Sequence, residues 1–268
     1  MCKILGVSKS GYYNRKKNGK SKRELEGLRL LTLIKRIYTE ARGVYGSPRI
    51  TAELLRRGEK CDKKRIARLM QSEGIKAKTV KRFKRTTNSN HKWKIEANIL
   101  NQNFNIGKPN RVWVSDITYI RTREGWLYLA AILDLYSRRV IGWKVDKELR
   151  SKLVTGALRR AVEERVDTSG IIFHSDRGVQ YASSEIKEML RKNGMIQSMS
   201  RRGNCYDNAV AESFFHSLKT EHVNFENYIT RNQASLSLFD YIEIFYNRKR
   251  LHSSIGYKSP VEYEQQNK

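Results

Sequence analysis

The 268-residue sequence has few of the residues that would indicate a disulfide-bonded, zinc-binding or membrane protein. It contains only three prolines and three cysteines, Cys2, Cys61 and Cys205, with no C-x-x-C pair and no matching histidine pair. Neither a disulfide framework nor a zinc site is therefore expected. No uninterrupted apolar stretch approaches the roughly 20 residues of a membrane helix, and the start of the sequence has no apolar signal segment. These absences predict a soluble protein of a reducing intracellular compartment.

Acidic residues are scarce relative to basic ones. The chain has 54 Lys and Arg against 27 Asp and Glu, a net charge of +27. Residues 1–94 contain 28 basic and 7 acidic side chains, whereas residues 95–268 contain 26 and 20. An excess this large and this lopsided favours a polyanionic partner, so we expect the first part to bind nucleic acid and the second to carry the chemistry. A membrane-surface patch or simple solubility is the alternative.

Start and stop signals in the first part outline a helix-turn-helix. A first helix is predicted to start at Ser47-Pro48 and to stop at Gly58, and a second to start at the cap Asp62 and to stop at Gly74. The second helix carries basic side chains suited to phosphate contacts. These candidate DNA-binding residues are Lys63, Lys64, Arg65 and Arg68. A three-helix packing module with a merely solvated basic face remains the alternative.

The pattern predicts three regions along the chain. Residues 1–85 form the helical region, which includes a longer amphipathic helix over 21–41. The apolar face of this helix is predicted to consist of Leu25, Leu28, Leu31, Ile34 and Ile37. Residues 86–108 form a linker. Residues 109–268 form a mixed α/β sheet domain, because apolar runs of strand type alternate with helical ones. Strands are expected at 111–120, 125–136, 138–146, 170–176 and 195–200, helices at 150–166 and 183–194, and two more helices after position 207.

Three acids stand where a metal site is expected. Asp116 and Asp176 lie at or near the ends of predicted strands, where α/β sheets usually build their sites. Thirty-five residues separate Asp176 from Glu212. Mg²⁺ binds carboxylates together with waters and substrate phosphates, so phosphoryl-transfer sites gather acids that would otherwise repel one another. The sequence therefore suggests a divalent-metal site.

The helix that carries Glu212 is expected to be two-faced. With 3.6 residues per turn, Phe214 and Leu218 fall on a packing face, while Glu212, His216 and Lys219 share the opposite one. A metal-binding acid with a lysine two turns later suits an enzyme that acts on nucleic acid, since the lysine can hold a phosphate. An exposed Glu–Lys pair without function is the competing interpretation.

Other polar residues near the acids have two interpretations each. Asp134 could approach the metals, but a turn-capping role is favoured. His174 either orients Asp176 or is a buried, hydrogen-bonded histidine. Asn208 is expected to cap or shape the loop before the Glu212 helix. Asn208 and His216 are also candidates to orient the acids without binding the metal themselves.

Four segments resemble the OrfB-type transposases of bacterial insertion sequences, within the larger class of DDE transposases and retroviral integrases. They are "WVSDITYI", "HSDRGVQY", "SRRGNCYDNAVAESFFHSLK" and "YNRKRLHSSIGYKSPVEYE", and the helix-turn-helix outline precedes them. The resemblance covers nearly the whole chain. It implies a ribonuclease-H-like fold, with Asp116, Asp176 and Glu212 as catalytic residues that hold two Mg²⁺ or Mn²⁺ ions. Lys219 would contact DNA near the scissile phosphate.

The resemblance also implies an activity and partners. The activity is metal-dependent DNA strand cleavage, followed by transfer of a 3′-hydroxyl to another strand and DNA integration, without a covalent protein–DNA intermediate. The partners are double-stranded DNA at the element ends and target, further copies of the chain on DNA, and the product of an upstream reading frame, since this sequence has no sustained heptad of its own. We expect a nucleoid-associated protein of the bacterial cytoplasm. A DNA-binding regulator with an inactive core and a structure-specific nuclease of the same fold are the alternatives.

Overall fold

The computed structural model describes residues 4, 6, 8–78, 95–202 and 204–266. The chain divides into two compact units, Met1–Lys78 and Thr79–Lys268. This division falls seven residues before the predicted end of the helical region at position 85. Residues 79–94, which contain that predicted end, lie outside the described residues, so the bounds 1–85, 86–108 and 109–268 stay a prediction.

The first unit is helical, as the sequence predicted. Its helices are α1 (Lys9–Asn18), α2 (Lys22–Glu40), α3 (Ser47–Arg56) and α4 (Lys63–Ser72). The last two match the predicted helix-turn-helix, and α4 starts where the Asp62 carboxylate accepts hydrogen bonds from the Lys64 and Arg65 amides. Each such cap satisfies amide groups that have no partner within the helix.

The core of the first unit is formed by α2, α3 and α4. Its buried residues are Leu30, Ile34, Ile37, Ile50, Leu54, Ile66 and Met70. On the predicted apolar face of α2, Ile34 and Ile37 are buried as predicted. The prediction was wrong for Leu25 and Leu28, whose side chains are 55% and 44% exposed. The buried positions of α2 begin only at Leu30, so its first turns carry apolar side chains outside this core.

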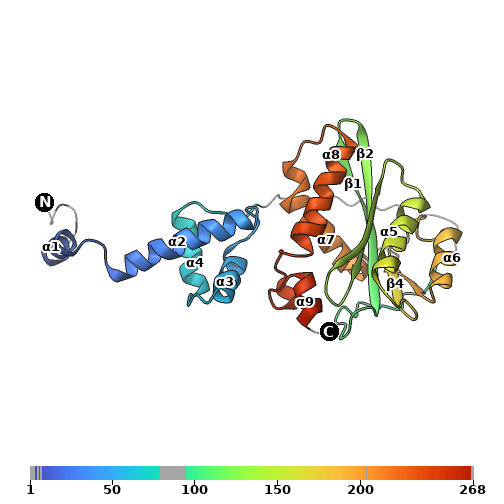
Figure 1. Ribbon diagram of the computed structural model, residues 1–268, viewed down its shortest axis with the longest axis horizontal. Helices are drawn as coiled ribbons and strands as arrows, with labels where there is room; N and C mark the ends of the chain where they lie inside the picture. Colours follow the sequence, from blue (N-terminus) through green and yellow to red (C-terminus); the bar gives the residue numbers. More distant parts are fainter. Residues whose placement is uncertain (1–3, 5, 7, 79–94, 203, 267–268) are drawn as a thin grey trace. The chain divides into compact units, whose positions relative to one another are not determined.

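The second unit is built on a five-stranded mixed sheet (Figure 1). The strands are β1 (Val112–Thr122), β2 (Gly125–Asp134), β3 (Val140–Asp146), β4 (Ile172–Ser175) and β5 (Ile196–Met199), in the order β3-β2-β1-β4-β5. The first three form an antiparallel meander, and β4 and β5 join β1 in parallel. The predicted mixed α/β sheet is therefore confirmed.

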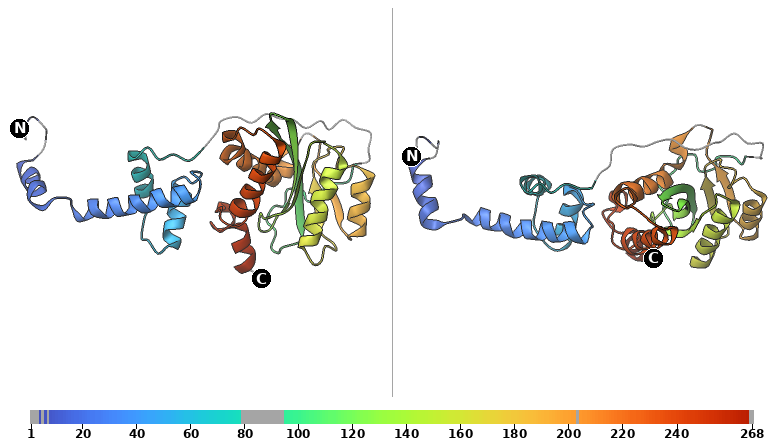
Figure 2. Two further views of the ribbon diagram at one scale, coloured as in Figure 1. Left: turned by 45° about the horizontal axis from the view of Figure 1, so that its top comes forward. Right: turned by 90° about the horizontal axis from the view of Figure 1, so that it is seen from above.

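Helices cover both faces of this sheet (Figure 2). Helices α5 (Ser151–Glu164) and α6 (Ser184–Lys192) pack on one face, and α7 (Ala209–Glu221) and α8 (Arg231–Phe239) on the other. A π-helical segment, Asp240–Tyr246, and α9 (Pro260–Gln266) complete the chain. The structure thus has one α-helix more after position 207 than predicted, since α9 is too short to show a clear periodicity. No helix in the described residues is long and apolar enough to cross a membrane.

Part of the predicted linker packs on the second unit. The amides of Ile99 and Leu100 donate to the Ser198 hydroxyl at 2.9 and 3.3 Å, and Leu100 is buried. The Met199 amide donates to the Ala97 carbonyl at 3.3 Å. Residues 97–100 of the predicted linker are therefore hydrogen-bonded to β5, while the bounds of that linker stay a prediction.

Candidate active site

The pairing of β1 with β4 places two of the predicted acids side by side. In this parallel ladder Ser115 lies opposite Ser175, and Asp116 and Asp176 are the next residues on their strands. Neighbouring strands lie only about 4.8 Å apart, so the two carboxylates start from adjacent backbone positions. Both side chains are partly exposed. The inner strands β1 and β4 therefore bring together two acids that are 60 residues apart in the sequence. Asp176 follows the last residue of β4 as predicted, whereas Asp116 lies within β1 and not at its end.

One oxygen of each acid is fixed by the local backbone. Asp116 Oδ1 accepts a hydrogen bond from the Ile117 amide at 2.7 Å, and Asp176 Oδ1 accepts one from the Gly178 amide at 2.9 Å. A Cβ atom at Gly178 would lie only 3.1 Å from Asp176 Oδ1, so glycine allows the turn to close around this carboxylate. These bonds limit the rotation of both side chains.

The electrostatic environment of Asp116 involves the other two predicted acids and Lys219. Burial raises the pKa of Asp116 well above its ordinary value, and the Asp176 charge raises it further, as Glu212 does to a smaller extent. The Ile117 amide and the Lys219 ammonium oppose this rise. Buried charges are screened less by water than exposed ones, so the charges of Asp176, Glu212 and Lys219 all act on the Asp116 carboxylate.

Helix α7 contributes the third acid and the lysine. Phe214 and Leu218 are buried, as predicted for the packing face, while Glu212 and Lys219 are partly exposed. The Lys219 ammonium lies 4.8 Å from the centre of the Tyr119 ring, and burial lowers its pKa while Asp116 raises it. His216 is exposed, and its side chain forms no hydrogen bond or ion pair among the described residues. The helix therefore directs Lys219 toward β1 and leaves His216 toward solvent.

The donor set fits a hard divalent cation. Mg²⁺ and Mn²⁺ take carboxylate oxygens as ligands, and a cation between Asp116, Asp176 and Glu212 would relieve the repulsion that raises the pKa of Asp116. Within the described part of the chain, no three His, Cys, Asp or Glu side chains already stand in an arrangement that could hold a metal ion. The three acids would therefore have to adjust their side chains on binding one.

Comparison with known proteins identifies the family. An Integrase core domain model matches residues 107–205 and a second model of that description matches 212–267, while an HTH-like domain model matches 26–83. Transposase InsF for insertion sequence IS3A of Escherichia coli (strain K12) is 38% identical over 100% of this chain and 93% of its own length. The chain belongs to the insertion-sequence transposase family of InsF.

Two further similarities agree with this assignment. The insertion element IS600 uncharacterized 31 kDa protein of Shigella sonnei is 40% identical over 99% of this chain and 97% of its own length. A chain of the simian T-cell lymphotropic virus intasome, in complex with PP2A regulatory subunit B56 gamma, superposes with a TM-score of 0.50 at 16% identity. That match covers 86% of this chain and 74% of the other. The predicted integrase-like, ribonuclease-H-like core is thus confirmed.

In the helix-turn-helix unit of this InsF-type chain, the four basic candidates of α4 are not equivalent. Lys63, Lys64 and Arg68 are exposed. Arg65 is partly buried and forms an ion pair with Glu26 at 3.1 Å, whereas the Arg68 side chain donates to the Lys64 carbonyl at 3.3 Å. The two lysines therefore present their charges to solvent most directly, and Arg65 is held by α2.

Two of the polar residues near the acids have hydrogen-bond partners that favour a structural role. His174 is buried, its ring nitrogens lie 2.9 and 3.2 Å from the hydroxyls of Ser198 and Ser200, and burial lowers its pKa to about 4. This favours the buried, hydrogen-bonded alternative. Asp134 accepts hydrogen bonds from the Asn110 and Tyr136 amides at 2.9 Å, which supports the turn-capping role, and burial raises its pKa to about 6.

Asn208 connects the α7 loop to the strand that carries Asp116. Its side-chain amide donates to the Ser115 carbonyl at 3.2 Å, and its Oδ1 is buried without a hydrogen-bond partner among the described residues. The preceding Asp207 is completely buried, and Arg201, Asn98 and Gln102 all donate to its carboxylate. These bonds hold the pKa of Asp207 below its usual range, chiefly through Arg201, and fix the loop from which α7 starts.

Tyr181 was not predicted, although it lies within the "HSDRGVQY" segment. Its buried hydroxyl lies 2.8 Å from the hydroxyl of Ser115, the residue that precedes Asp116 on β1. Burial raises its pKa well above the ordinary value, and the charges of Asp116 and Asp176 raise it further. The phenol therefore stays neutral and forms part of the floor beneath the two acids.

The far end of α7 is held by an ion pair that the sequence did not reveal. Arg250 donates to Glu221 through Nε at 2.7 Å and Nη2 at 2.6 Å, and both side chains are buried. Tyr241 donates its hydroxyl to the same carboxylate at 2.9 Å. Burial alone would lower the pKa of Arg250, but Glu221 raises it well above the ordinary value. This pair ties the C-terminal segment to the helix that presents Glu212 and Lys219.

We predict that Arg250→Met destabilises the protein by about 3–5 kcal/mol, because it leaves the buried Glu221 charge unpaired. The double variant Arg250→Met, Glu221→Met should lose less than the sum of the single variants. Chemical denaturation measures both. The exposed pair of Lys192 and Glu188 is the matched control, and Lys192→Met should cost under about 1 kcal/mol. Equal small losses for the buried and the exposed pair would contradict the assigned role.

Proposed function

We propose that this protein is a transposase that cleaves DNA at the ends of an insertion sequence and transfers the freed 3′-hydroxyl to a second DNA strand. The observation that carries the proposal is the placement of Asp116 and Asp176 directly after paired residues of neighbouring parallel strands. Glu212 and Lys219 act on the same carboxylate from α7. Relatives with 38–40% identity over nearly the whole chain, one of them named a transposase, support the same conclusion.

Asp116, Asp176 and Glu212 are proposed to hold two Mg²⁺ or Mn²⁺ ions. Such ions lower the pKa of a bound water or hydroxyl and neutralise the charge that develops on the transferred phosphoryl group. The chain supplies three carboxylates in one field, two of them with one oxygen already fixed by the backbone. It also supplies the unpartnered Asn208 Oδ1 next to Ser115, a polar atom that a water at the site could satisfy.

The DNA is proposed to be held by cations from both units. Lys219 is suited to bind a phosphate beside the acids, because its ammonium is partly buried and directed toward β1. Lys63, Lys64, Arg65 and Arg68 would contact the backbone of double-stranded DNA from the helix-turn-helix unit, the exposed lysines most strongly. The protein would act as a homo-oligomer that brings element ends and target together, with the product of an upstream reading frame as a further partner.

We predict that Asp176→Asn and Glu212→Gln each abolish cleavage and joining, because each removes a metal ligand. DNA binding should stay nearly unchanged, since most affinity comes from phosphate contacts elsewhere. The assay uses full-length protein, Mg²⁺ or Mn²⁺, and DNA carrying the element ends. Asp167→Asn, at a solvent-exposed carboxylate, serves as the control. Near-normal cleavage by the Glu212→Gln protein would refute the assignment.

Pre-cleaved ends in the same assay distinguish a transposase from a nuclease of the same fold. A transposase joins an end that already carries a free 3′-hydroxyl to a target strand, whereas a nuclease releases cut strands only. We expect joined products. Their absence, together with efficient cutting, would show that the site belongs to a nuclease.

Lys219 is predicted to act on DNA more than on folding. Lys219→Met keeps the apolar stem against Tyr119 but removes the charge, so the thermal midpoint should change little. The strand-transfer rate should fall by about tenfold or more, and Lys219→Arg should recover part of it because the positive charge remains. Thermal melting and strand transfer are measured on the same preparations. A large drop in melting temperature with a proportionate loss of activity would mean that Lys219 is structural.

A further inference from the structure

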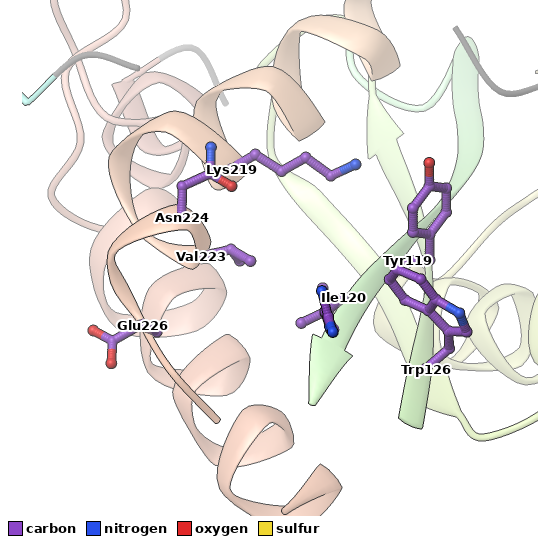
Figure 3. A pocket seen from close by; sticks show the side chains of 8 residues that line it. Tyr119, Ile120, Trp126, Lys219, Val223, Asn224 and Glu226 are labelled. Atoms are coloured by element: carbon purple, nitrogen blue, oxygen red, sulfur yellow. The ribbon is translucent and has the colours of Figure 1, made fainter. Parts of the chain in front are cut away.

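A groove of about 330 Å³ opens beside Lys219 (Figure 3). Strands β1 and β2 contribute Tyr119, Arg121 and Trp126, whereas Lys219, Asn224 and Glu226 come from α7 and the segment after it. Pockets for small molecules range over about 300–1,000 Å³, so the space suits one planar group and is too small for a DNA duplex.

One wall of the groove is aromatic and partly exposed. The rings of Tyr119 and Trp126 meet edge to face with their centres 5.1 Å apart, and Trp126 is 47% exposed. An indole left half in water at the edge of a binding groove indicates a stacking surface more than a core residue. Strand β4 pairs with β1 only as far as Ser115, so beyond this point only β2 is paired with β1 among the described strands.

Charge divides the groove into two ends. Lys219 reaches across from α7 toward Tyr119, with its nitrogen 4.8 Å from the ring centre, and it also acts on Asp116 in the proposed active site. Glu226 lines the groove away from the aromatic wall and is exposed. Arg121 adds a second cation to the lining. A phosphate is therefore favoured on the side of Lys219 and Arg121 and disfavoured near Glu226, while an uncharged planar group is suited to the aromatic wall.

We propose that this groove binds one unpaired nucleotide of a DNA strand, with its base against Trp126 and Tyr119 and its phosphate toward Lys219. The base must be unpaired because a groove of about 330 Å³ is too small for a base pair with its two backbones, and an unpaired base costs least to lift out of the stack. The proposal rests on the proposed function, since it takes DNA as the substrate. It assigns to this groove the capture of an opened strand end next to the catalytic acids.

The test compares two DNA duplexes of identical length with full-length protein and no divalent metal, so that catalysis plays no part. One duplex is blunt, and the other has two mismatched, unpaired bases at its end. Stacking of a base on an aromatic side chain contributes roughly 1–3 kcal/mol, which corresponds to about 5- to 150-fold in affinity. Fluorescence anisotropy should therefore show that the protein binds the frayed duplex at least about fivefold more tightly.

Variants then assign this preference to the groove. Trp126→Ala should bring the ratio of the two affinities close to one, Trp126→Phe should keep most of it, and abasic sites in place of the unpaired bases should abolish it. Phe239→Ala is the matched control, because Phe239 is 49% exposed on α8 and does not line the groove. This control should keep the full preference, and all variants should melt close to the parent.

Three outcomes would overturn the inference. The first is equal binding of blunt and frayed duplexes by the parent protein. The second is a preference that survives Trp126→Ala, and the third is one that survives removal of the bases, which would indicate recognition of phosphate alone. If any of these occurs while strand transfer in Mg²⁺ is intact, the groove assignment fails and the proposed transposase function stands.

Discussion

The parallel alignment of β1 with β4 is the constraint on which the rest of the site depends. The ladder sets Ser115 opposite Ser175, and so makes Asp116 and Asp176 neighbours where the pairing of β1 with β4 ends. A shift of one residue would turn a strand's side chains to the opposite face. The hydrophobic core stabilises this register. Trp113 and Phe173 lie opposite each other two residues before the Ser115–Ser175 pair, and both are completely buried in the same core. Packing of these two rings thus determines where the acids lie.

Gathering like charges has an energetic cost, which the surrounding structure offsets. The repulsion among Asp116, Asp176 and Glu212 opposes folding as long as no cation is bound. Two buried polar networks hold α7 in place against it. Asp207 fixes the loop before the helix, and the pair of Arg250 with Glu221 fixes its far end. The site is therefore preorganised by residues that do not touch the reacting atoms.

Much of this architecture could be predicted from the sequence. Periodicity and capping signals gave the order of strands and helices, including α3 and α4, and the acids were recognised from their positions after apolar runs. These are local patterns, which a sequence displays directly. The family resemblance supplied the roles of Asp116, Asp176 and Glu212 together with the ribonuclease-H-like fold.

Apart from the short helix α9, the features that escaped prediction depend on contacts between distant parts of the chain. Arg250 meets Glu221 across 29 residues, and the Leu100 amide meets Ser198 across 98. Nothing in the local pattern marks either pair. The exposed Leu25 and Leu28 show the converse, because an apolar periodicity does not reveal where a neighbouring helix stops covering it. In the sequence, Trp126 likewise looks like an ordinary strand residue. Its place in the groove becomes visible only when β1 and β2 are folded beside α7.

The central claim is that the carboxylates of Asp116 and Asp176 share one electrostatic field. A double-mutant cycle tests it most directly, with the unfolding free energies of the parent, Asp116→Asn, Asp176→Asn and the double variant measured at pH 7 in a chelating buffer. Once one carboxylate is neutral, the other is no longer repelled, so the second substitution should stabilise less than it does alone. We predict a non-additivity of about 0.5–3 kcal/mol. Strictly additive effects of the two substitutions would contradict the account.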